Sequence, residues 1–130
     1  MNTLLAIDFA EPDVLDRVLA IDNDALDRLD FGVIGFDETT AVRVYNSFES
    51  KAAGLSPDRV LGHPLFTVVA PCMNNFMVAQ RFEEAAAASV ALDDTIAYVL
   101  TLRMRPVKVR LRLLCRPGAP YRYVLVSRNP

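Results

Sequence analysis

Hydrophobic and polar residues follow a helical period over the first third of the chain. Apolar residues recur every three or four positions between residues 14 and 29, at Val14, Leu15, Val18, Leu19, Leu26 and Leu29. The polar run 22–24 interrupts this pattern, which therefore predicts two short helices rather than one. Residues 31–36 are apolar, 37–40 have turn character and 41–45 alternate, which predicts a β-hairpin.

Two kinds of helix signal follow the hairpin. Asn46 with Glu49 three positions later is typical of a helix N-terminus, and Gly54 suits its end. Ser56-Pro57 repeats the start signal, which predicts another single turn. A longer helix is expected from Asn74 or Asn75 to about Ala91, with Phe76, Val78, Ala79 and Phe82 on one face.

The period then changes to two. Ile96, Tyr98, Leu100, Leu102 and Met104 share one face of a strand predicted over residues 95–105, and two further strands are expected over 107–113 and about 121–127. The order of elements predicts an α+β domain with a central antiparallel sheet of about five strands, the PAS-like arrangement. Residues 1–130 would form this single domain, with 1–30 as an N-terminal helical cap and 31–130 as the PAS core.

Charge divides the chain into an acidic and a basic end. All 16 acidic residues lie at or before Asp94, and residues 101–130 contain eight basic residues and no acid. The helices of the core would cover one face of the sheet, and the other face would present Arg103, Arg105, Lys108, Arg110 and Arg112. Because residues 1–30 carry eight acids and two arginines, we expect this segment to cap the basic face.

Composition excludes several classes of protein. A chain of 130 residues that is 52% hydrophobic and 23% charged is typical of one globular domain. The net charge of -2 argues against a nucleic-acid partner. Neither a transmembrane stretch nor a secretory signal is evident, so we expect a cytoplasmic protein with no membrane partner, and Cys72 and Cys115 as free thiols.

Several segments together carry a family resemblance. They are residues 29–34 (LDFGVI), Tyr45-Asn46 with Glu49, Gly54, residues 60–62 (VLG), 69–72 (VAPC) and 104–109 (MRPVKV). In this combination and order they resemble the photoactive yellow protein family, over roughly Leu26 to Arg128. The resemblance implies a PAS-fold blue-light photoreceptor.

The resemblance also implies a chromophore site. Cys72 matches the family cysteine that carries p-coumaric acid (4-hydroxycinnamic acid) as a covalent thioester, and its predicted place before a helix N-terminus favours the thiolate. Tyr45 and Glu49 match the pair that holds the phenolate oxygen. Burial raises a carboxyl pKa, so a protonated Glu49 could donate to that oxygen. The remaining cofactor-binding candidates form the apolar pocket: Ile34, Val69, Ala70, Pro71, Tyr98 and Met104.

Each of these residues also has an ordinary structural interpretation. Cys72 could be a small buried residue, Glu49 could complete a capping box with Asn46, and the apolar residues could be plain core. Two positions depart from the family pattern: Ala53 replaces a threonine that supports the tyrosine hydroxyl, and Leu55 replaces an arginine that screens the phenolic ring. Both changes remove polar support from the site.

The resulting hypothesis is a light-driven signalling protein. Isomerisation of the chromophore, proton transfer from Glu49 and release of the N-terminal cap would expose a surface to an unknown downstream signalling protein, from a monomer or weak homodimer. The alternative is a non-photoactive PAS-like module that binds a ligand or another protein. Enzymatic activity is not expected, because His63 is the single histidine and no catalytic triad or zinc spacing can be assembled around it.

Overall fold

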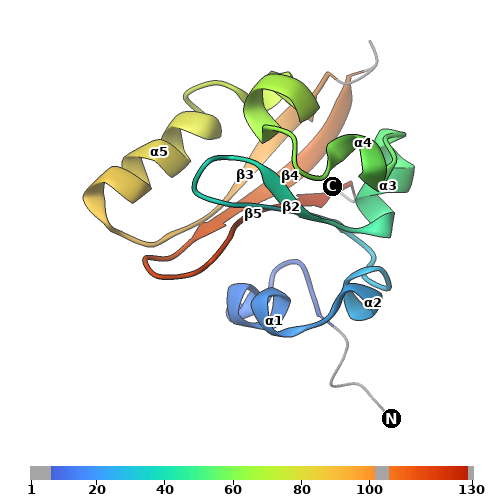
Figure 1. Cartoon of the computed structure of the whole chain (residues 1–130), viewed down its shortest axis with the longest axis horizontal. Helices are drawn as coiled ribbons and strands as arrows, with labels where there is room; N and C mark the ends of the chain where they lie inside the picture. The colour runs from blue at the N-terminus through green and yellow to red at the C-terminus, as the bar shows by residue number, and fades with distance from the viewer. Residues whose placement is uncertain (1–6, 102–105, 129–130) are drawn as a thin grey trace.

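The computed structural model describes residues 7–101 and 106–128 and has five strands and several short helices (Figure 1). The strands are β1 (Gly32–Phe36), β2 (Val42–Tyr45), β3 (Leu92–Leu100), β4 (Val107–Cys115) and β5 (Arg122–Ser127). The α-helices are α1 (Val14–Ala20), α2 (Asn23–Leu26), α3 (Ser47–Ala53), α4 (Pro57–Val60) and α5 (Ala79–Ala88), and two further helical turns are η2 (Leu65–Val69) and η3 (Pro71–Met73).

The strands form one antiparallel sheet in the order β2-β1-β5-β4-β3. The last strand of the chain, β5, lies in the middle, where Val124 is opposite Ile34 on one side and Leu113 on the other. The helices α3, α4 and α5 fall between β2 and β3 in the sequence. The predicted α+β architecture with a five-stranded antiparallel sheet is therefore confirmed.

The sheet has a hydrophobic core on each face. On the first face, buried residues of β1, β4 and β5 pack against the segment 60–85, which includes Phe66 and Phe82. On the second face, residues 7–29 pack against Phe31, Val33 and neighbouring apolar residues of β4 and β5. Figure 1 shows α1 and α2 together on the side of the sheet away from α3, α4 and α5. The predicted N-terminal cap thus occupies the second face, which we call the cap face.

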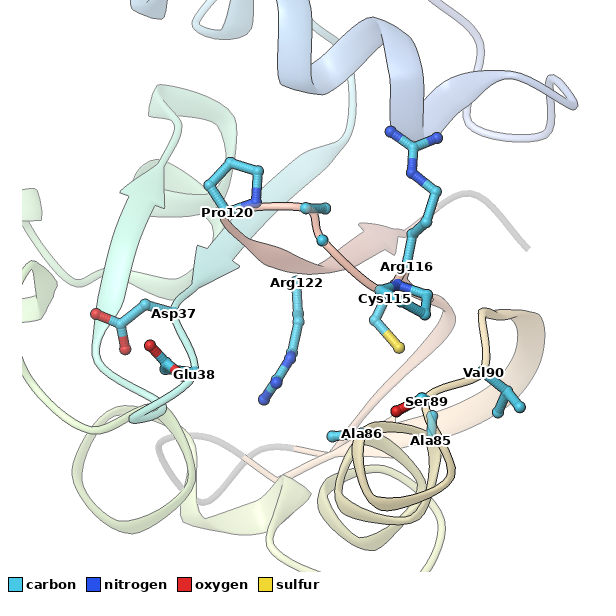
Figure 2. Close-up of a pocket in the computed structure, with 13 residues that line it drawn as sticks. Asp37, Glu38, Ala85, Ala86, Ser89, Val90, Cys115, Arg116, Pro120 and Arg122 are labelled. Carbon is cyan, nitrogen blue, oxygen red and sulfur yellow. The ribbon is translucent and has the colours of Figure 1, made fainter.

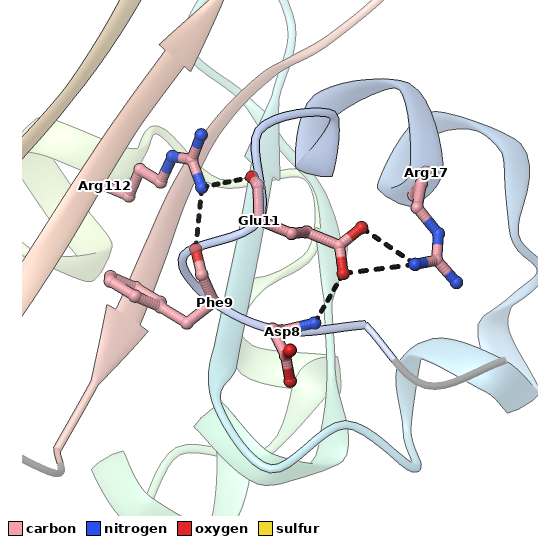
Figure 3. Close-up of polar contacts among 5 residues, drawn as sticks. All are labelled: Asp8, Phe9, Glu11, Arg17 and Arg112. Atoms are coloured by element: carbon pink, nitrogen blue, oxygen red, sulfur yellow. Dashed lines mark hydrogen bonds and ion pairs between the residues drawn. The ribbon is translucent and has the colours of Figure 1, made fainter. Parts of the chain in front are cut away.

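Arg112 of β4 binds the cap through its backbone (Figure 3), whereas the charge pattern predicted contacts with the acidic side chains of the cap. The Arg112 guanidinium is buried and donates to the backbone oxygens of Phe9, at 2.8 Å, and Glu11, at 2.7 Å. The same guanidinium pairs with Asp93 on β3 at 2.8 Å. One cation therefore connects the cap to two strands, and its donors satisfy carbonyl groups that the docked cap removes from water.

Two neighbouring arginines add weaker contacts to the cap. Arg110 lies 5.3 Å from the centre of the Phe9 ring, in cation–π geometry, and Arg116 pairs with Asp16 of α1 at 2.5 Å. Lys108 is exposed, whereas Arg103 and Arg105 lie outside the described residues. No helix in residues 7–101 or 106–128 is both long and apolar enough to cross a membrane.

The predicted start of the longest helix is wrong. We expected a helix from Asn74 or Asn75, but α5 begins at Ala79. The Asn75 side chain accepts from the backbone N–H groups of Met77 and Val78, so its polar cap forms a turn ahead of the helix. Cys72 consequently lies in the separate turn η3, and the predicted helix N-terminus beside its thiol is absent there.

Candidate functional site

Asn46 places the start of α3 against the sheet and the cap. Its side-chain oxygen accepts from the N–H groups of Glu49, at 3.1 Å, and Val33, at 2.9 Å. Its amide nitrogen donates to the backbone oxygens of Leu26 and Phe31, both at 3.0 Å. The predicted N-cap is confirmed, and this fully bonded, buried side chain connects α3, β1 and the cap.

Glu49 points from α3 toward the end of β5. Its side chain is 3% exposed and Arg128 is 19% exposed, and Arg128 donates to both carboxylate oxygens, at 2.8 and 3.2 Å. In a capping box the Glu49 side chain would accept from the backbone N–H of Asn46. This N–H donates to the backbone oxygen of Val33. The alternative in which Glu49 completes a capping box with Asn46 is therefore wrong.

A glycine of β1 makes room for this carboxylate. A side-chain carbon added at Gly32 would collide with Oε1 of Glu49. Burial raises the pKa of Glu49, although the hydrogen bonds and positive charge of Arg128 oppose this rise. The site therefore contains a buried carboxyl whose protonation depends on one arginine.

Tyr45 presents an unsatisfied hydroxyl near the same carboxyl. Its oxygen is buried and has no hydrogen-bond partner among the described residues. Burial, and secondarily the negative charge of Glu49, raises the pKa of this hydroxyl, so it stays a donor at neutral pH. Because Ala53 lines the same cavity and offers no oxygen, the expected loss of polar support for Tyr45 is seen directly.

A small apolar cavity lies between Tyr45, Glu49 and the sheet. Its volume is about 10 Å³, roughly the space of a single water molecule. Its lining contains seven positions that the sequence analysis singled out: Ile34, Tyr45, Glu49, Ala53, Leu55, Val69 and Ala70. Three further lining residues were not predicted as site residues: Met73, Leu100 and Val126. A group larger than water would bind here only if these side chains moved outward.

Cys72 lies beside this cavity in the turn η3. The thiol is free and half-buried, and Cys72 packs against the same core cluster as Tyr98. The Tyr98 hydroxyl donates to the Cys72 carbonyl oxygen at 2.6 Å, and Asn75 donates to that carbonyl at 3.2 Å and to Tyr98 at 2.6 Å. Two side chains thus hold the cysteine turn in place.

The structure brings together most of the predicted site, but not all of it. Tyr45 and Glu49 line the cavity with Ile34, Val69 and Ala70, whereas Cys72 and Tyr98 do not line it and pack against the same core cluster. Pro71 is exposed and does not line the cavity. Met104 lies outside the described residues.

Arg128 and Asn75 are the polar residues that the sequence analysis missed. Arg128 ends the resembling region but carries no local motif, and only the central position of β5 brings it to Glu49. Asn75 was recognised only as a helix cap, and its contact with Tyr98 spans 23 residues. Of the lining residues that were not predicted, Leu100 and Val126 could have been found from the sequence, because each falls on the alternating pattern of a predicted strand.

A larger groove lies elsewhere on the molecule. It has a volume of about 430 Å³ and is bounded by the β1–β2 turn, the end of α5 and the β4–β5 turn. Figure 2 shows the Arg122 side chain extending between Asp37 and Glu38 on one side and Ala85 and Ala86 on the other. No predicted site residue belongs to this groove, and its cysteine is the buried Cys115 rather than Cys72.

The residues of the small cavity suit the p-coumaroyl group that the resemblance implies. Such a group needs a thiol for its thioester, an apolar surround and a donor for its phenolic oxygen. Cys72 is a partly accessible thiol, the cavity walls are apolar, and the Tyr45 hydroxyl is a buried donor that no described residue satisfies. The donor set therefore fits, provided that the lining side chains move.

Comparison with known proteins finds related photoreceptors. The chain is 32% identical over 107 residues to photoactive yellow protein from Rhodothalassium salexigens, covering 82% of this chain and 85% of that protein. It is 30% identical to the protein of the same name from Halochromatium salexigens, with the same coverage. No protein-family model matches the chain.

Solved structures give the same relationship. The photoactive yellow protein domain of the sensor histidine kinase Ppr from Rhodospirillum centenum superposes with a TM-score of 0.75 and 30% identity, over 82% of this chain and 92% of that one. The PAS domain of a quorum-sensing receptor from Cronobacter turicensis, solved in complex with BDSF, has a TM-score of 0.60 and 11% identity over 78% of this chain and 95% of that one. The second likeness is one of fold alone.

Proposed function

Since this chain belongs to the photoactive yellow protein family of PAS-fold photoreceptors, we propose that it is a blue-light receptor that carries a p-coumaroyl group as a thioester on Cys72. When bound, this group supplies light absorption, isomerisation about its double bond and a phenolate oxygen. The protein itself acts as a sensor and not as an enzyme. One observation carries the proposal: the buried Tyr45 hydroxyl, which has no hydrogen-bond partner among residues 7–101 and 106–128, shares a cavity with the carboxyl of Glu49 beside the Cys72 turn.

The side chains divide the work of the site. The sulfur of Cys72 forms the thioester bond, and Tyr98 and Asn75 hold the backbone of this residue. The Tyr45 hydroxyl would donate a hydrogen bond to the phenolate oxygen, which would offset the cost of burying an anion. The apolar lining excludes water and so strengthens this bond.

Glu49 is the side chain that changes its protonation in the proposed light response. With the group bound, a protonated Glu49 would donate a hydrogen bond to the phenolate oxygen in the dark and would supply the proton that this oxygen takes up after light. The carboxylate that is left is buried on α3, three residues after Asn46, whose side chain donates to the backbone oxygen of Leu26 in the cap. A new charge at this point strains the contacts between the core and the cap, and we propose that the signal is cap release toward a downstream protein.

Chromophore attachment is the first test. Purified protein is mixed with activated p-coumaric acid, and intact mass and visible absorbance are recorded for the unaltered chain, Cys72→Ala and the matched control Cys115→Ala. Cys115 is buried and burial raises the pKa of its thiol, so it should be a poor nucleophile. We expect one adduct with a visible band that bleaches in blue light, kept in Cys115→Ala and lost in Cys72→Ala.

The opposite results identify the alternative. No adduct on the folded protein, or labelling that persists in Cys72→Ala, would leave a PAS-like ligand-binding or interaction module. The features that favour this alternative are Ala53, Leu55 and the small cavity volume.

A further inference from the structure

The buried ion pair between Glu49 and Arg128 has a consequence for the charge of the site. A carboxylate that accepts from the two terminal nitrogens of one guanidinium, at 2.8 and 3.2 Å, is in the geometry of an ionised acid. The pair lies almost out of water, with Glu49 3% exposed. At such a position an unpaired charge costs far more than at the surface.

The surroundings of the carboxyl contain one cation. The charged or titratable groups that act on Glu49 among the described residues are Arg128, from the end of β5, and Tyr45, from β2. The neighbouring strand β1 contains no charged residue, and its Gly32 lies against the carboxylate. Leu55, half-buried and in the cavity lining, brings no charge. Among the described residues, Arg128 is therefore the cation that opposes the effect of burial on Glu49.

We propose that Arg128 is the counter-ion of the site, and that it pairs with Glu49 whenever Glu49 lacks its proton. The role extends the proposed function, on which its second half rests. Before a phenolate is present, one cation balances one carboxylate. With a buried phenolate added, one cation would face two anions, so Glu49 takes up a proton. Once Glu49 has passed that proton on, its carboxylate returns to Arg128.

This arrangement changes the expected response to light. An unpaired buried carboxylate would force the structure to open. When Arg128 is available to pair with the carboxylate, the ion pair offsets most of the cost of burying this charge. Arg128 therefore limits the release of the cap. Loss of Arg128 should enlarge the light-induced opening of residues 7–29.

The first experiment needs no chromophore. The protonation of Glu49 is followed by carboxyl infrared or ¹³C NMR signals in the full chain, assigned with Glu49→Gln. The variants are Arg128→Gln, the conservative Arg128→Lys, and Arg59→Gln as a matched control at an exposed arginine of α4. At neutral pH we expect a carboxylate in the unaltered chain, Arg128→Lys and Arg59→Gln, and a protonated acid in Arg128→Gln.

Identical titration of Glu49 in Arg128→Gln and the unaltered chain would overturn the proposal. If Arg128→Gln does not fold, the double variant Glu49→Gln/Arg128→Gln decides, because it removes both charges of the pair. If the double variant folds, the unpaired charge of Glu49 caused the failure of Arg128→Gln, which supports the proposal. If the double variant also fails to fold, loss of the ion pair is not the cause, which counts against the proposal.

The second experiment uses the chromophore-loaded protein. Hydrogen exchange of residues 7–29 is compared in light and dark, with a larger light-induced increase expected in Arg128→Gln than in Arg59→Gln. An equal increase overturns the limiting role of Arg128. Absence of any adduct defeats the proposed photoreceptor function instead, and the chromophore-free titration then still decides whether Arg128 is the counter-ion.

Discussion

The two faces of the central sheet are covered in different ways. On the face with the candidate site, Phe36, Phe66 and Phe82 pack ring to ring, and the segment that covers the sheet is continuous with β2 and β3. On the cap face, a terminal segment is held by apolar contacts and by a buried arginine that binds its backbone. The first face cannot open without disrupting the sheet connections, whereas the second can lose its cover as a unit.

Replacing one buried phenylalanine on each face by alanine should give the largest difference in stability between the two faces. Phe82→Ala leaves a cavity beside the rings of Phe36 and Phe66 and should reduce the free energy of unfolding by about 4 kcal/mol. Phe9→Ala, whose ring contacts Phe31 and Arg110, should cost about 2 kcal/mol, mainly as local opening of the cap. Urea unfolding measures the first effect and hydrogen exchange of residues 7–29 the second. Uniform loss of protection along the chain in Phe9→Ala would contradict this division.

Removal of the buried arginine sharpens the contrast further. Arg112→Gln removes the charged hydrogen bonds to Phe9 and Glu11 and should destabilise the docked cap by about 2 kcal/mol. The matched variant Lys108→Gln changes an exposed cation of the same strand and should have little effect. Hydrogen exchange in the cap is the measurement, and equal effects of the two variants would mean that basic charge alone holds the cap.

The two faces should respond to pH in opposite directions. Although burial opposes it, hydrogen bonds from the Asp8 backbone and Arg17 lower the pKa of Glu11 below 4.5, so its stabilising contribution is lost as pH falls through that lowered value. The pKa of Glu49 is raised above 4.5, so its contribution is present at lower pH and is lost as pH rises through the raised value. The free energy of unfolding is measured against pH in Glu11→Gln and Glu49→Gln. Glu11→Gln should remove a contribution that increases with pH, and Glu49→Gln should remove one that decreases with pH. Slopes of the same sign would refute the assignment.

Salt should produce the smallest effect and should act on the cap face. The pair of Arg116 and Asp16 is largely exposed, so Arg116→Ala should cost only about 0.3 kcal/mol. Raising the salt concentration should loosen the cap slightly in the unaltered chain and less in the variant, because salt screens exposed charges. Cap exchange rates that do not change with salt would show that apolar and buried contacts hold it.

Local patterns in the sequence determined the elements and the division of the sheet into two faces. Strand alternation placed Leu111 and Leu113 toward the core and Arg110 and Arg112 toward the cap, because side chains alternate across a strand. The family resemblance, rather than periodicity, identified Cys72, Tyr45 and Glu49. Side-chain type and spacing sufficed for these features because the physical signals are local.

Only the tertiary structure decided the environment of Glu49. Arg128 is 79 residues away in the sequence and reaches this carboxyl because β5 inserts next to β1 in the middle of the sheet. The missing partner of Tyr45 and the bond between Tyr98 and the Cys72 turn likewise depend on distant segments. Hydrophobic periods specify which face a residue occupies but not which polar groups meet there, since those contacts depend on strand order and register.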